Sequence, residues 1–152
     1  MARDPIADLV HRYADAVVHH DAERWGSTWA PDATWDLGGG RVTQGREAIV
    51  AFWLQAMDSF EAVIQLVFNG TSELDEAAGT GTGRWYIQES FQQPGDQRGV
   101  LVAHYDDRYR LIDGRWLFAR RDLVVHYAGP PDLSAPFQNA WGPVSGGEPP
   151  GR

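Results

Sequence analysis

The strongest constraint on the fold is an Asp-Gly dipeptide at residues 113–114 between two long strand-like segments. Asp-Gly is typical of the two-residue turn of a β-hairpin, because both turn residues then adopt positive φ. The flanking segments are 104–112 and 115–127, and segment 82–89 alternates apolar and polar residues in the same way. Two or three consecutive antiparallel strands are therefore predicted within residues 81–122, in a curved sheet with one buried face.

Helical periodicity precedes these strands. Apolar residues recur at three- and four-residue intervals from Pro5 to about His20, which predicts an amphipathic helix. Further helices are predicted over 22–29 and 46–57, with strands over 33–37 and 63–73. Helices followed by antiparallel strands favour an α+β fold: a curved, mostly antiparallel sheet wrapped around N-terminal helices.

The length and composition indicate one globular domain. A chain of 152 residues can bury one sizeable core, and 12% aromatic content with seven Trp predicts an aromatic interior. We expect this domain to span residues 1–140. Residues 141–152 are rich in Gly and Pro, so they are predicted to form a disordered tail.

The charge balance limits the partners. A formal net charge of -8 argues against nucleic acid and against an anionic membrane, because both require a basic surface. No apolar run has the length of a membrane span, and the N-terminus lacks the apolar core of a signal peptide. A cytoplasmic location is therefore expected, with a small molecule as the partner.

The chain contains no lysine and no cysteine. Schiff-base chemistry, covalent pyridoxal phosphate and a Walker A loop all need a lysine, and thiolate catalysis and zinc-thiolate sites need cysteine. Carboxylate, imidazole, phenol and amide chemistry remain.

Five motifs together resemble the SnoaL-like branch of the nuclear transport factor 2-like superfamily. They are Tyr13-Ala-Asp-Ala16, Trp29-Ala-Pro-Asp-Ala-Thr-Trp35, Gly45-Arg-Glu-Ala-Ile49, Gly83-Arg-Trp-Tyr86, and Tyr105-x-Asp107-x-Tyr109 with Asp113-Gly-x-Trp116. The resemblance covers roughly Ile6 to Tyr127. It implies a cone-shaped α+β barrel with an apolar pocket at its open end, commonly in a homodimer. Relatives such as scytalone dehydratase, bile-acid 7α-dehydratase and polyketide cyclases mostly move protons without a metal or organic cofactor, so the resemblance implies neither a metal ion nor a cofactor here.

The resemblance also implies where an acid/base pair would lie. The dehydratases of this branch carry an aspartate late in the first helix and a histidine on the strand after the third helix. The first position falls on Val18 here, and the second falls near Val67 or Phe68. Both usual catalytic groups are therefore absent from these positions.

Two other carboxylates are candidates for proton transfer. Asp15 lies one helical turn before Val18, so it replaces the missing aspartate or, alternatively, only fixes the helix through hydrogen bonds. If Trp85 points inward, Glu89 does so too, and burial would raise its pKa to a useful range. The alternative is that the strand leaves the sheet near Glu89 and this carboxylate is solvated.

Polar side chains are predicted beside these carboxylates. Tyr13 and Tyr105 are candidate hydrogen-bond donors to a carbonyl or developing oxyanion, although Tyr13 also fits a core position. Asp107 shares the face of Tyr105 and either binds ligand or makes a structural hydrogen bond. Asn69 either orients the substrate or serves the turn before Gly70.

The remaining candidates are expected to form the wall of the pocket, as core or as ligand contacts. They are Val18, Trp35, Trp53, Met57, Val67, Phe91, Phe118 and, at the mouth, His126. Their apolar and aromatic character predicts an apolar ligand, for which a ring-shaped body is one candidate.

Two functions fit this pattern. The first is a cofactor-independent lyase, isomerase or cyclase, in which Asp15 or Glu89 transfers a proton and Tyr13 and Tyr105 polarise an oxygen. The second is a non-catalytic ligand-binding or accessory protein that has lost the acid/base pair. Exposed aromatic residues on an open sheet favour a homodimer in both cases.

Overall fold

The computed structural model describes residues 3–139 and 141. In chain order the elements are α1 (Pro5–Val18), α2 (Ala22–Gly26), β1 (Trp29–Asp36), β2 (Val42–Gln44), α3 (Arg46–Met57), β3 (Ala62–Asp75), β4 (Thr80–Gln93), β5 (Gln97–Ile112) and β6 (Arg115–Gly129). Within this part of the chain, no helix is both long and apolar enough to cross a membrane.

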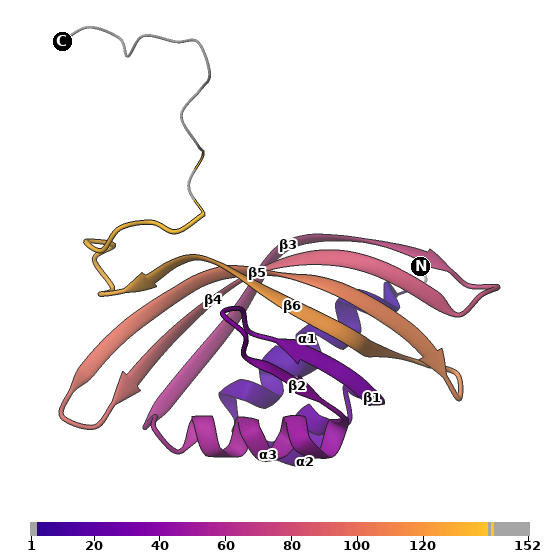
Figure 1. Ribbon diagram of the computed structural model, residues 1–152, viewed down its shortest axis with the longest axis horizontal. Coiled ribbons are helices and arrows are strands. Elements are labelled where there is room, and N and C mark those ends of the chain that lie inside the picture. The colour runs from indigo at the N-terminus through magenta and orange to yellow at the C-terminus, as the bar shows by residue number, and fades with distance from the viewer. Residues whose placement is uncertain (1–2, 140, 142–152) are drawn as a thin grey trace, which may run out of the picture.

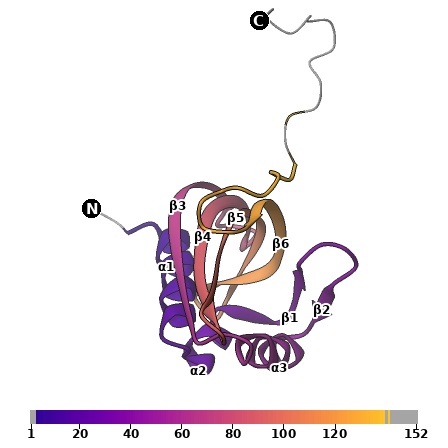
Figure 2. The same ribbon diagram turned by 90° about the vertical axis from the view of Figure 1, so that its left-hand side faces the viewer.

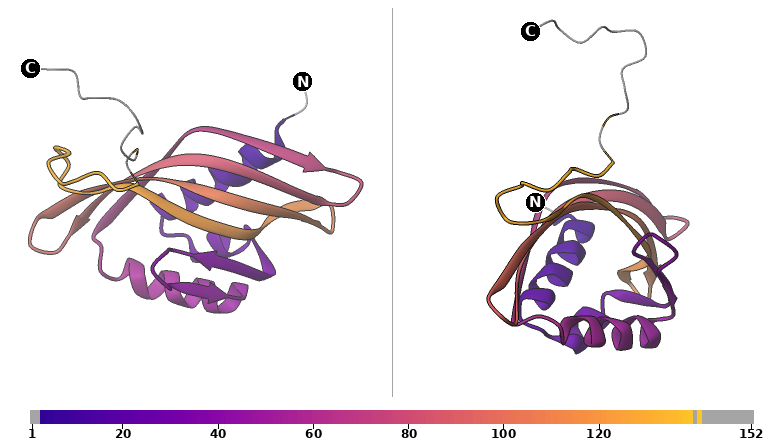
Figure 3. Two further views of the ribbon diagram at one scale, coloured as in Figure 1. Left: turned by 45° about the horizontal axis from the view of Figure 1, so that its top comes forward. Right: turned by 60° about the vertical axis from the view of Figure 1, so that its left-hand side comes forward.

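The six strands form one strongly curved sheet in the order β2-β1-β6-β5-β4-β3. All neighbours are antiparallel except β1 and β6, which run parallel. The sheet arches over α1, and α3 closes the open side below it (Figure 2, Figure 3). This arrangement confirms the predicted α+β cone, with its sheet wrapped around N-terminal helices.

Helix α1 begins where the sequence predicts. The Asp4 carboxylate accepts hydrogen bonds from the backbone N–H groups of Ile6 and Ala7, and Pro5 occupies the first turn, where a missing N–H has no cost. One face of the helix is buried against the sheet, above all against β3, which lies beside α1 in Figure 2. The apolar periodicity of residues 5–20 therefore corresponds to real burial.

The prediction of a helix over residues 22–29 is wrong at its C-terminal end. Helix α2 ends at Gly26, and β1 begins at Trp29, four residues earlier than predicted. Trp29 is fully buried and pairs with Phe118 of β6, so packing overrides the local helical pattern. The pairing of β1 with β6 is irregular between Trp29 and Thr34, which accommodates Pro31 without a ladder N–H.

The predicted hairpin turn is confirmed. Asp113 and Gly114 have φ of 51° and 76°, and Ile112 pairs with Arg115 across the turn. Positive φ at both central residues is the geometry that matches the twist of the flanking strands.

A cluster of aromatic rings fills the space between the helices and the sheet. Trp25 stacks on Trp53 with 4.6 Å between ring centroids, and it contacts the edges of Trp29 and Trp35. Tyr13 joins this cluster from α1. Because Tyr13, Trp35 and Trp53 also face an internal cavity, the aromatic core forms part of the cavity wall.

After β6 the chain folds back along the sheet. The Tyr127 hydroxyl donates to the Pro130 carbonyl at 2.6 Å, and the Gln138 N–H donates to the His126 carbonyl at 2.7 Å. Figure 1 shows this segment on the side of the sheet opposite α1 and α3. Apart from Trp141, the predicted disordered tail of residues 141–152 lies outside the described residues.

Candidate functional site

An internal cavity of about 260 Å³ lies between the concave face of the sheet and the helices α1 and α3. Its lining comprises Tyr13, Val17, Trp35, Leu37, Arg41, Trp53, Ala56, Met57, Phe60, Gln65, Glu89, Phe91, Leu101, Tyr105 and Leu123. A cavity of roughly 150 Å³ holds benzene, whereas sites for drug-sized ligands begin at about 300 Å³. The cavity therefore suits a molecule of one or two rings.

The lining residues differ in exposure, which identifies a deep end and a mouth. Tyr13, Trp35, Gln65 and Tyr105 are all buried. Val17 and Trp53 are buried as well, Arg41 is exposed, and the other lining residues, including Glu89, are partly exposed. The cavity therefore opens toward the β1–β2 hairpin that carries Arg41.

Glu89 is the one carboxyl group in this lining. The alternation of β4 turns Trp85, Ile87 and Glu89 to the concave face, and Glu89 pairs with Gln65 of β3 and Leu101 of β5. Burial raises the pKa of Glu89 to about 7, and a hydrogen bond from Gln65 opposes this shift. Near neutral pH both the acid and the carboxylate are thus accessible, as a proton-transfer group requires.

Gln65 suits both protonation states of its partner. It is 6% exposed, and its Oε1 atom has no hydrogen-bond partner among the described residues. Its amide can donate from Nε2 to a Glu89 carboxylate, or turn over and accept from a protonated Glu89. The unpartnered oxygen means that no other hydrogen bond opposes this turn.

Two tyrosine hydroxyls lie at the deep end of the cavity. Burial raises the pKa of Tyr13 and of Tyr105, so both stay protonated and can donate. The Trp35 Nε1–H donates to the Tyr105 hydroxyl oxygen at 3.2 Å, which fixes that phenol and leaves its own proton for another acceptor. These groups are placed to polarise an oxygen atom of a bound molecule.

A buried ion pair, formed by Arg121 and Asp107, packs against the rings of these tyrosines. Arg121 donates from Nε and Nη2 to the Asp107 carboxylate at 2.7 and 3.1 Å, and the Tyr109 hydroxyl donates to the same carboxylate at 3.0 Å. The guanidinium lies over the rings of Tyr105 and Tyr13, at 3.9 and 4.5 Å from their centroids. Burial opposes the charge of Arg121, but Asp107 outweighs it and keeps the pKa of Arg121 raised.

Two roles are predicted for Asp107 from the sequence, a ligand contact or a structural hydrogen bond. The structure places it in this ion pair, outside the cavity lining. Both its oxygens are occupied by Arg121 and Tyr109, so its role here is structural.

The structure also places Asp15 outside the cavity. Its side chain is 49% exposed and forms ion pairs with Arg24 and, at 3.5 Å, with His19. The cavity face of α1 is formed by Tyr13 and Val17, and a residue two positions from Tyr13 is rotated by about 200°. The shared face of Asp15 and Val18 is therefore the solvent side of the helix.

The predicted wall residues divide into two groups. Trp35, Trp53, Met57 and Phe91 lie in the cavity lining, but Val18, Val67, Asn69, Phe118 and His126 do not. Val18 and Asn69 are exposed, and Phe118 is fully buried in the aromatic core. Val67 is partly buried and packs against the core, next to an irregularity in the pairing of β3 and β4.

His126 lies on the convex face of the sheet, away from the cavity. Its Nε2 is 2.8 Å from His104 Nδ1, and Tyr86 packs against both imidazoles. His104 Nε2 lies 3.3 Å from an oxygen of Asp106. Across residues 3–139 and Trp141, no three His, Cys, Asp or Glu side chains are arranged to hold a metal ion.

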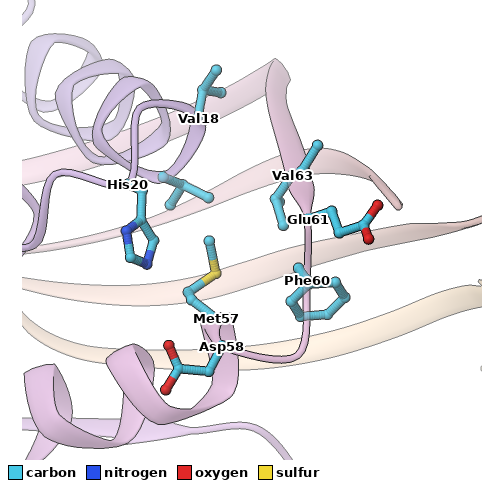
Figure 4. A pocket seen from close by; sticks show the side chains of 9 residues that line it. Val18, His20, Met57, Asp58, Phe60, Glu61 and Val63 are labelled. Carbon is cyan, nitrogen blue, oxygen red and sulfur yellow. The ribbon is translucent and has the colours of Figure 1, made fainter. Parts of the chain in front are cut away.

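A second depression, larger at about 370 Å³, lies beside the cavity at the ends of α1 and α3 (Figure 4). Its two carboxylates, Asp58 and Glu61, lie on opposite sides and point away from one another. Val17, Met57 and Phe60 line both this depression and the internal cavity, so the two are adjacent. With no converging polar groups, the depression is a weaker candidate than the cavity.

The sequence and the fold were compared with known families, curated proteins and solved structures. The SnoaL-like domain family matches residues 1–122 of the chain. No curated protein matches it.

Solved structures share the fold. A proposed scytalone dehydratase from Novosphingobium aromaticivorans has a TM-score of 0.78 at 18% identity, over 92% of this chain and 93% of that one. LinA has a TM-score of 0.76 at 24% identity, over 90% and 92%. A type 3 LinA, the hexachlorocyclohexane dehydrochlorinase of Novosphingobium barchaimii, has a TM-score of 0.74 at 22% identity, over 90% and 92%. At such identities the likeness concerns the fold and not the reaction.

Proposed function

The chain belongs to the SnoaL-like domain family, and from this premise we propose that it is a cofactor-independent proton-transfer enzyme. The reaction is of the dehydratase, isomerase or cyclase type, on a small apolar substrate, cyclic or polyketide-like, held in the cavity. One observation carries the proposal: a single carboxyl group, Glu89, lies in an apolar cavity with a pKa of about 7. A buried carboxyl group that forms no structural ion pair is typical of a catalytic acid or base.

The geometry supports a division of roles. Glu89 as carboxylate removes a proton from a carbon atom next to a carbonyl, and Tyr13 or Tyr105 donates a hydrogen bond to the oxygen on which negative charge develops. The protonated Glu89 then returns the proton to another carbon, or to a leaving hydroxyl. Gln65 holds Glu89 in both states.

5-Nitrobenzisoxazole tests this base directly. Removal of the proton on its C3 carbon breaks the ring N–O bond and releases a coloured cyanonitrophenolate, so no second reactant is needed. At pH 8, where Glu89 is ionised, we expect turnover by the wild type and a loss of about 100-fold or more in Glu89→Gln. Glu76→Gln, in an exposed turn, is the matched control and should retain wild-type turnover.

The variant Asp15→Asn tests which of the two predicted carboxylates, Asp15 or Glu89, transfers the proton. Because Asp15 lies outside the lining, this variant should keep the wild-type rate. A large loss in Asp15→Asn with none in Glu89→Gln would reverse the proposed roles.

A second function, a non-catalytic ligand-binding or accessory protein, is favoured by a different observation. The positions of the family's acid/base pair carry Val18 and Val67, neither of which titrates. Tight binding of the benzisoxazole without Glu89-dependent turnover would favour this function.

We further propose that the protein acts as a homodimer in the cytoplasm. Ile64, Leu66 and Phe68 are each at least half exposed, and they follow one another on the convex face of the edge strand β3. Such a contiguous apolar row is typical of an interface.

A further inference from the structure

The β1–β2 hairpin brings an arginine to the mouth of the cavity. Gly38, Gly39 and Gly40 all have positive φ, which only glycine adopts easily in succession. Backbone hydrogen bonds from Leu37 N–H to Arg41 O at 3.0 Å and from Arg41 N–H to Gly38 O at 3.1 Å close the turn. The turn thus places Arg41 beside Leu37 in the cavity lining.

The guanidinium of Arg41 is held in place but not neutralised. Its Nε donates to the Gly38 carbonyl at 3.2 Å and its Nη2 donates to the Leu37 carbonyl at 2.9 Å. Among the described residues, no carboxylate lies within ion-pair distance of it. Six other arginines do pair with aspartate: Arg24, Arg84, Arg98, Arg110, Arg120 and Arg121.

Other arginines of the described chain, such as Arg46 and Arg108, also lack an ion pair, so what sets Arg41 apart is its place in the cavity lining. Arg41 is the one cation in the cavity lining, and most of the other lining side chains are apolar. The two backbone carbonyls orient the group while leaving its Nη1 donors free for a ligand.

We propose that Arg41 binds an acidic group of the substrate, which is therefore a small carboxylic acid, or a comparable organic anion, with an apolar body of one or two rings. The apolar body occupies the cavity between Trp35, Trp53 and Phe91, and the anionic group stays at the mouth. This inference rests on the proposed function only in placing the substrate in the same cavity.

The two ends of such a ligand suit the two ends of the cavity. An anion at the mouth is solvated on one side and paired with a guanidinium on the other, so it avoids the cost of full burial. The ring then reaches Tyr105 at the deep end and the partly buried Glu89 on the cavity wall. Arg41 would fix the orientation of the ring relative to Glu89.

A matched pair of probes, 2-naphthoate and 2-naphthamide, tests the proposal. They share a two-ring body and nearly the same shape, but only the naphthoate is charged. Binding is followed by calorimetry and by the fluorescence of the cavity tryptophans at pH 6. We expect the wild type to bind naphthoate at least tenfold more tightly than naphthamide.

The variant Arg41→Met keeps the length of the side chain and removes its charge. It should lose the preference for naphthoate while binding naphthamide as the wild type does. Arg108→Met removes one charge from an exposed residue outside the lining and should retain the preference. Circular dichroism checks that both variants are folded.

The outcomes separate this inference from the proposed function. The proposal is overturned if the wild type binds both probes equally, or if Arg41→Met keeps the preference for naphthoate. Arg41 would then only stabilise the glycine turn through its hydrogen bonds. In that case the cavity still binds ligand, and the proposed function stands. If neither probe binds, the cavity has lost its assigned role and both proposals fall.

Discussion

The surroundings of Glu89 favour its protonated form, so the stability of the fold depends on pH. In the unfolded chain its pKa is near 4.5, and in the folded protein it is about 7. Between these values the folded state keeps a proton that the unfolded chain releases, so stability falls as the pH rises through this window. The loss is complete above pH 7.

We predict that Glu89→Gln removes this pH dependence. The amide cannot ionise, so relative to the wild type the variant should gain up to about 3 kcal/mol of unfolding free energy between pH 5 and pH 8. Urea denaturation at both pH values measures the difference. Equal pH dependence in the wild type and the variant would show that Glu89 is solvated.

Asp107 and Asp106 are adjacent in sequence but lie on opposite faces of β5. Asp107 is buried with Arg121, whereas Asp106 forms a half-exposed pair with Arg84 at 2.7 Å. We predict that Asp107→Ala costs about 3–5 kcal/mol of stability, because it leaves a buried guanidinium uncompensated. Asp106→Ala should cost about 1 kcal/mol or less. Similar losses in both variants, measured by urea denaturation, would contradict this assignment.

Strand parity was enough to place part of the site from sequence. Alternation over 82–89 predicts that Trp85 and Glu89 share a face, and the structure places both on the concave side. Helix α3 and the Asp113-Gly114 turn were predictable for the same reason, since each depends on local pattern and turn chemistry. What the sequence could not supply was the pairing of distant segments.

Gln65 and Arg41 show this limit. Gln65 faces Glu89 only because β3 and β4 pair in one particular register, and any other register would have placed another residue there. Arg41 reaches the cavity because β1 joins β6 in parallel, a connection between residues far apart in the chain. For Asp15, the helical period was right, but the face that meets the cavity depends on the packing of α1 against the sheet.

Gly70 in β3 permits the close packing of Trp85 in the opposite strand. A Cβ atom at Gly70 would lie 2.3 Å from the Trp85 ring, which is too short for any contact. We predict that Gly70→Ala destabilises the fold by about 1–3 kcal/mol, because the buried indole must move. The neighbouring exposed variant Thr71→Ala should cost about 1 kcal/mol at most. Loss of near-ultraviolet circular dichroism only in Gly70→Ala would identify the displaced tryptophan.

At the scale of the molecule, the two faces of the sheet have separate tasks. The concave face carries the cavity, and the convex face carries the His104–His126 pair and the returning C-terminal segment. Figure 3 shows that the helices cover only the concave side. The convex face is thus the part of the sheet left for assembly, and β3 ends it as an edge strand without a partner in the described chain.

The proposed homodimer can be tested on this edge. Leu66 is 50% exposed and Phe68 is 55% exposed, on the convex face of β3. We predict that the wild type is dimeric in light scattering and that Leu66→Glu with Phe68→Glu is monomeric, because two carboxylates cannot be buried unpaired in an apolar interface. Val42→Glu, an exposed apolar position on β2 at the opposite edge of the sheet, is the control and should stay dimeric. The cavity lies on the other face, so a folded monomer that still binds naphthamide would separate assembly from ligand binding. A wild-type monomer would instead leave the apolar row for another partner.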